Sequence, residues 1–146
     1  MAGRIVHFEV PYDDAERARD FYSSLFGWQL QWLPEMDYTM VSTGPMSEQG
    51  MPTEPGFING GMAKREGPVE HPVVVIDVED IDTTLKAVGE KGGSTLMERQ
   101  PVGDMGFTAY FRDCEGNVMG LWQSAAPQGG GRPEAQAAGS EPDYTV

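Results

Sequence analysis

The chain has 146 residues, 39% of them hydrophobic and 23% charged, which is typical of one soluble globular domain large enough to bury a core. Its net charge of −13 argues against nucleic acid and anionic membrane surfaces as partners, because their phosphates would be repelled. No apolar run approaches the roughly 20 residues that a membrane span requires. The single cysteine excludes an internal disulfide, and we therefore expect a cytoplasmic protein.

The first half of the chain predicts one helix among four strands. Residues 4–10 alternate loosely between apolar and polar side chains and indicate a strand. Asp13 and Asp14 are suited to cap a helix that Gly27 would end. The apolar residues of that helix recur at helical spacing: Ala15, Ala18, Phe21, Tyr22 and Leu25. Further strands are predicted at residues 28–33, 38–43 and 57–65, and a loop rich in Gly, Pro, Ser and Met separates the last two.

The second half repeats this order. Residues 72–78 predict a strand, Asp80 a helix cap, and Gly92 and Gly93 the end of the helix. One face of that helix carries Ile81, Leu85 and Val88. Strands are predicted at residues 94–99, 106–112 and 118–123. Residues 126–146 contain few large apolar groups and predict a disordered tail, because such a segment cannot bury enough surface to offset its ordering entropy.

The chain is therefore interpreted as an internal repeat, strand-helix-strand-strand-strand twice over. Asp14 aligns with Asp80 in the two helix caps, and the glycines that end the two helices also align. Farther along, Gly60 aligns with Gly120. A glycine inside a strand often marks close approach by a ligand or by another backbone, so we interpret these two glycines as part of a site.

Four segments carry a resemblance to a known family: HFEVPYDDAERARDFYSSLFGW, INGGMAKR, VVVIDVEDIDTTLKAVGEKGG and MGFTAYFRDCEGNVMGLW. They resemble the vicinal oxygen chelate superfamily, which includes glyoxalase I, extradiol dioxygenases, fosfomycin-resistance enzymes and bleomycin-binding proteins. The resemblance covers about residues 4 to 124. It is closest to a bacterial branch usually described as "predicted enzyme related to lactoylglutathione lyase".

The resemblance implies an α+β fold of two βαβββ modules, which form a half-open cupped sheet with the helices on its outer face. This is the glyoxalase/bleomycin-resistance fold. We expect a single domain at residues 1–125, with module one at about 4–65 and module two at about 71–124, followed by the tail at 126–146. A homodimer is expected from the same resemblance.

Metal-using members of the family place four ligands in the cup, one from the first and one from the last strand of each module. His7 fits the first of these positions, but its repeat partner is Val73, which cannot bind a metal. Gly60 and Gly120 stand where the resemblance predicts a carboxylate. We therefore predict no cofactor, because a lone imidazole binds a divalent metal weakly.

An alternative leaves a divalent metal open. His7, Glu9 and His71 form a set of two imidazoles and one carboxylate, which is a known three-donor combination. The competing interpretation is that His7 and Glu9 are polar residues lining a wet cavity, and that His71 is a strand-edge residue.

Strand alternation assigns the remaining site residues. His7 and Glu9 are the candidate catalytic residues and the expected polar groups of a largely apolar cavity. The expected ligand-binding residues are Ile58, Gly60, Met62, Val73, Val75, Gly120 and Trp122. The preferred hypothesis is a protein that binds a small, partly apolar organic molecule without the complete metal site of the family. One alternative is an enzyme, either a glyoxalase-like lyase or isomerase that uses His7 and Glu9 with a weak or non-standard divalent metal, or a dioxygenase-related enzyme. The other alternative is a non-catalytic dimeric interaction module.

Overall fold

The computed structural model describes residues 2–125, and it divides the chain into two compact units, Met1–Ile76 and Asp77–Val146. The tail predicted at residues 126–146 lies outside the described residues. Within the described part, none of the helices is long and apolar enough to cross a membrane.

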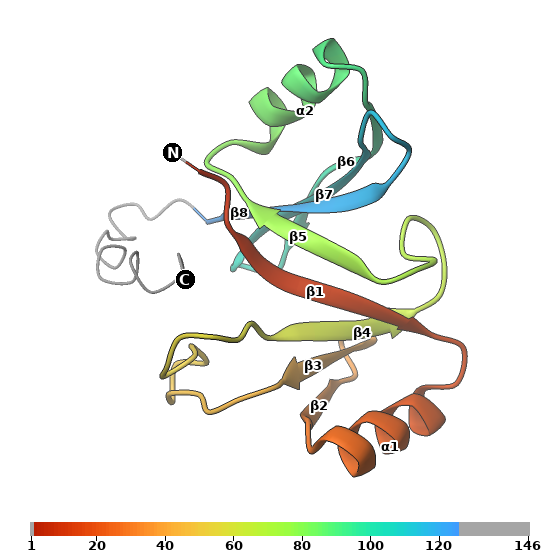
Figure 1. The fold of residues 1–146 in the computed structure, drawn as a ribbon, viewed down its shortest axis with the longest axis vertical. Helices are drawn as coiled ribbons and strands as arrows, with labels where there is room; N and C mark the ends of the chain where they lie inside the picture. The colour runs from red at the N-terminus through yellow and green to blue at the C-terminus, as the bar shows by residue number, and fades with distance from the viewer. Residues whose placement is uncertain (1, 126–146) are drawn as a thin grey trace. The chain divides into compact units, whose positions relative to one another are not determined.

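The first unit contains one helix and five strands, drawn in red to yellow-green in Figure 1. Its strands lie in the order β2-β3-β4-β1-β5, and all neighbours are antiparallel except β1 and β4, which are parallel. In chain order the elements are β1 (Ile5–Tyr12), α1 (Ala15–Phe26), β2 (Gln29–Leu33), β3 (Tyr38–Ser42), β4 (Gly60–Lys64) and β5 (Val73–Asp77), whose last residue belongs to the second unit.

Helix α1 has the boundaries that its capping residues predict. The side chain of Asp14 accepts a hydrogen bond from the backbone N–H of Arg17 at 3.0 Å, which satisfies one of the unpaired donors of the first turn. Gly27 ends the helix in the left-handed conformation, with φ of 72°, and its N–H donates to the carbonyl of Ser23.

The core of the first unit lies between α1 and one face of the sheet. Its buried members are Tyr12, Val41 and Met62, and Ala15, Ala18 and Tyr22 of α1 pack against them together with Phe8, Val10, Trp28 and Leu30. Phe21 and Leu25 were expected on the same helical stripe but are 51% and 60% exposed. The stripe of α1 that packs on the core is therefore only partly buried, and it is narrower than the apolar spacing suggests.

The second unit contains α2 (Ile81–Glu90), β6 (Ser94–Val102), β7 (Gly106–Arg112) and β8 (Val118–Ser124). Its strands are antiparallel and lie in the order β8-β7-β6 (Figure 1). Ile81 and Leu85 of α2 are buried, as the helical spacing predicts. The N–H of Ile81 donates to Oε1 of Gln123 at 2.8 Å, which ties the start of α2 to β8.

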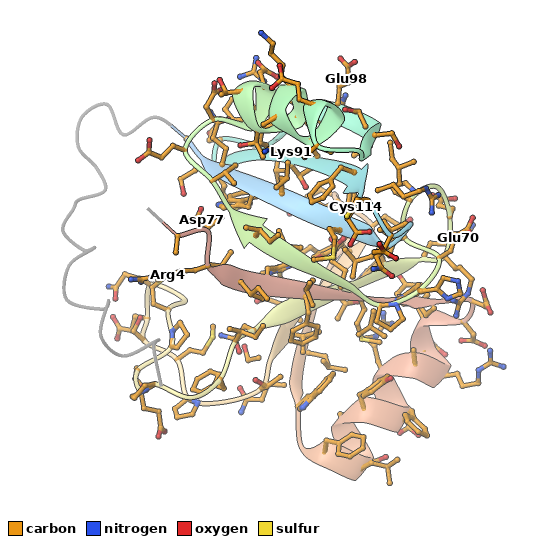
Figure 2. The ribbon with its side chains drawn as sticks, turned by 45° about the horizontal axis from the view of Figure 1, so that its top comes forward. Arg4, Glu70, Asp77, Lys91, Glu98 and Cys114 are labelled. Carbon is orange, nitrogen blue, oxygen red and sulfur yellow. The ribbon has the colours of Figure 1, made fainter. Side chains whose placement is uncertain are left out.

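The acidic turn before β8 is organised by Asp113. Its Oδ1 accepts hydrogen bonds from the N–H groups of Glu115 and Asn117, each at 2.8 Å. These bonds lower the pKa of Asp113, and those from Asn117 contribute most. Gly116 has φ of 88°, a conformation that a side chain would strain. Cys114 is exposed in this turn (Figure 2).

The α+β class and the order of all ten predicted elements are confirmed. Two strand boundaries differ by three residues from those predicted, and the other strand boundaries agree to within two residues. The strand predicted at residues 57–65 starts only at Gly60, and β6 continues to Val102 instead of ending at residue 99.

Candidate functional site

The two faces of the first unit's sheet are distinguished by strand β1. Phe8 and Val10 pack into the core beneath α1, so their neighbours His7 and Glu9 point to the opposite face. We call this opposite face the site face. Glu9 is only 8% exposed, and His7 is partly buried.

The facing predicted for Gly60 and Met62 is wrong. In the parallel pairing of β1 and β4, Gly60 lies beside Phe8 and Met62 beside Val10, which places both on the α1 side. Met62 is fully buried in the core, and a side chain at Gly60 would collide with Phe8. Because side chains alternate with a period of two, an error of one residue moves the whole strand to the other face. The glycine on the site face is Gly61.

Tyr38 at the start of β3 joins the two predicted polar residues. Its hydroxyl donates a hydrogen bond to Oε2 of Glu9 at 2.9 Å. The hydroxyl oxygen of Tyr38 also lies 2.8 Å from Nε2 of His7. We call these three side chains the polar network. They come from two strands that are not adjacent, since β4 lies between β1 and β3.

Gly61 on the intervening strand makes this arrangement possible. A Cβ atom at this position would overlap the hydroxyl end of Tyr38. The phenol therefore reaches His7 and Glu9 by crossing β4 over Gly61, which has no side chain.

The polar network fixes the orientation of the imidazole protons. A tyrosine hydroxyl carries one proton, and that of Tyr38 is directed at Glu9, so Nε2–H of His7 donates to the hydroxyl oxygen. Burial lowers the pKa of His7, and the negative charge of Glu9 opposes this shift only in part. A neutral His7 then has an acceptor at Nδ1, for which the described residues offer no hydrogen-bond partner.

The other predicted residues of the first unit are not part of the polar network. Val75 and Val73 of β5 pair with His7 and Glu9, and both are buried, at 4% and 3% exposed. Ile58 precedes β4, and its carbonyl accepts a hydrogen bond from the hydroxyl of Thr43 at 2.8 Å. His71 precedes β5 and is exposed.

The predicted three-donor metal set is not assembled. Among the described residues, no three His, Cys, Asp or Glu side chains form a group that could hold a metal ion. Within the polar network, Nε2 of His7 and Oε2 of Glu9 are both engaged by the Tyr38 hydroxyl. The donors present therefore do not fit the metal that the family implies.

The second unit carries the remaining predicted residues on one face. Gln123 points toward α2, so Val118, Gly120 and Trp122 point away from that helix, as strand alternation predicts. Gly120 pairs with Tyr110 of β7, and the ring of Trp122 lies over the backbone of Gly106. The ligand-binding role of this group stays a prediction.

Comparisons with known proteins agree with this fold. Residues 4–44 match a family described as bleomycin resistance protein-like N-terminal. The chain is 33% identical over 126 residues to a glyoxylase-like domain-containing protein of Didymella fabae, an alignment covering 83% of this chain and 94% of the relative. It is 29% identical over 133 residues to a probable lactoylglutathione lyase of Vibrio parahaemolyticus, covering 88% and 96% of the two chains.

A solved structure shares the fold at lower sequence similarity. Methylmalonyl-CoA epimerase, in complex with methylmalonyl-CoA and NH4+, superposes with a TM-score of 0.58 at 18% identity, covering 86% of this chain and 97% of that one. The chain belongs to the vicinal oxygen chelate superfamily and has the glyoxalase/bleomycin-resistance fold.

Proposed function

We propose that the protein binds a small, partly apolar organic molecule on the site face, with the polar network as its hydrogen-bonding centre. The single observation that carries this proposal is the pair of hydrogen bonds that links His7 to Tyr38 and Tyr38 to Glu9. Buried polar groups in a largely apolar setting are typical of sites that orient one ligand. The acceptor at Nδ1 of His7 suits a ligand that donates a hydrogen bond, such as a hydroxyl or an amide N–H.

The charge of the site face supports a neutral or cationic ligand. Glu9 contributes a carboxylate, and strand alternation places no Lys or Arg of β1 to β4 on this face among the described residues. An anionic ligand would lack a counter-charge there, and the net charge of −13 would oppose its approach.

A ligand screen tests this proposal. Neutral, cationic and anionic metabolites are screened by thermal shift, and hits are measured by calorimetry with the wild-type protein and with His7→Ala. Neutral or cationic hits whose affinity falls at least about tenfold in His7→Ala, as the loss of one good hydrogen bond predicts, support the proposal. Tyr22→Phe is the matched control, because its hydroxyl makes no hydrogen bond with the described residues and its ring stacks on Trp28 instead. Hits of equal affinity for wild type and His7→Ala would refute it.

A second candidate is proton transfer next to a carbonyl, in the manner of a glyoxalase-like isomerase. The observation that favours it is the continuous hydrogen-bonded path between an imidazole and a carboxylate, along which a proton can move. Hydrogen–deuterium exchange at the carbon next to the carbonyl, followed by NMR, tests it. Lactoylglutathione and methylmalonyl-CoA, the compounds named for two relatives, are included as anionic probes. Exchange that is undiminished in His7→Ala would exclude this role for the imidazole.

A homodimer is proposed as the assembly, and a non-catalytic dimeric module is the remaining alternative. Supporting it are three exposed apolar side chains on α1, those of Phe21, Leu25 and Phe26, which are 51%, 60% and 61% exposed. Such surfaces often mark protein–protein contacts. The cytoplasmic location stays a prediction from the single cysteine.

A further inference from the structure

In the polar network, the Tyr38 hydroxyl occupies the space in which His7 and Glu9 could together bind a metal ion. Nε2 of His7 and Oε2 of Glu9 are the two potential metal-ligand atoms that both lie next to the Tyr38 hydroxyl. Both are within hydrogen-bonding distance of this one oxygen, at 2.8 and 2.9 Å.

An ion that used both donors would have to lie about 2.0–2.2 Å from each of them. The space between these two atoms is where the phenol end of Tyr38 lies. An ion and this side chain therefore exclude each other, because the hydroxyl oxygen and the ring carbon that bears it fill the same volume.

Strand β4 cannot supply a further metal ligand. Gly61 is the β4 residue that faces the network, and any side chain there would overlap the Tyr38 hydroxyl. The glycine and the tyrosine thus depend on each other. Gly61 gives the phenol its path, and the phenol occupies the space into which a carboxylate on β4 would reach.

We propose that Tyr38 closes a latent cation site, so that His7 and Glu9 serve a metal-free polar network in this protein and become metal ligands once the phenol is removed. The inference takes the site face as the functional face, as the proposed function does. Its test uses metal ions alone, so its failure would leave the ligand-binding proposal standing.

The test is a metal titration of the full chain. Co²⁺ binding is followed by visible absorption, which reports on its ligands, and Ni²⁺ binding by calorimetry. The variants are Tyr38→Ala, which opens the space, and Tyr38→Phe, which removes the hydroxyl but keeps the ring. We expect Tyr38→Ala to bind at least about tenfold more tightly than wild type, and Tyr38→Phe to resemble wild type. In a Tyr38→Ala, His7→Ala double variant the gain should be lost, which separates it from adventitious binding to the acidic surface.

Tyr38→Ser provides a second opened variant, because its short side chain does not reach across Gly61 to His7 and Glu9. It should gain His7-dependent binding of the same kind, and it keeps the test valid if Tyr38→Ala does not fold. The proposal is overturned if wild type binds Co²⁺ through His7 as tightly as the opened variants. It is equally overturned if the folded opened variants bind no better than wild type.

Discussion

Removing the Tyr38 hydroxyl should destabilise the protein by an amount that the polar network sets. Tyr38→Phe loses the bond to Glu9, whose acceptor is a carboxylate only 8% exposed, and the bond from His7. A hydrogen bond to a charged group contributes about 1.5–3 kcal/mol and a neutral one about 1 kcal/mol. Both Glu9 and Tyr38 have further interactions, which compensate for part of the loss. We expect a decrease of about 2 kcal/mol in the free energy of unfolding, or about 6–8 °C in Tm.

Guanidinium unfolding followed by tryptophan fluorescence measures this change, since the chain has three Trp residues. The matched control is Tyr22→Phe, which removes a hydroxyl that makes no hydrogen bond with the described residues, and which should change stability by less than about 0.5 kcal/mol. Equal stability of the two variants would refute the reasoning, because it would mean that the polar network contributes nothing to the fold.

Three further predictions concern other parts of the chain. Gly60→Ala should lower the free energy of unfolding by about 1–3 kcal/mol through overpacking, because its methyl group would lie 2.5 Å from the carbonyl oxygen of Phe8. The methyl group of Gly89→Ala in α2 would meet nothing within 4 Å, and this variant should raise the free energy of unfolding by about 0.5–1 kcal/mol. Chemical denaturation of both variants checks this. Asp113→Asn should lower Tm at neutral pH. Since the pKa of Asp113 is lowered by folding, the difference from wild type should disappear as the pH falls below 3.8 and through the lowered value, and an unchanging difference would contradict this. Leu25→Glu should convert the proposed dimer to a monomer in size-exclusion chromatography with light scattering, and a dimer that persists would place the contact elsewhere.

The order and type of the elements could be predicted from the sequence because the signals for them are local. Asp14 and Gly27 set the two ends of α1 through contacts within one turn of the helix. The facing of β8 was also predictable, since the strand pairs with β7 without a bulge and side chains then alternate strictly between its two faces. The helical spacing of α1 was less reliable, because it cannot distinguish Tyr22, which packs on the core, from Phe21, which is exposed.

The site itself depended on a register that the sequence leaves open. In the phrase INGG either glycine could have faced the site, and only the pairing of β4 with β1 selects Gly61. The same pairing brings Tyr38 across Gly61 onto His7, although the two side chains are 31 positions apart in sequence. His7 and Glu9 could be named as the polar pair from their spacing on one strand. Their partner could not, because hydrogen bonds between non-adjacent strands follow from how the sheet is assembled and leave no periodic signal in the chain.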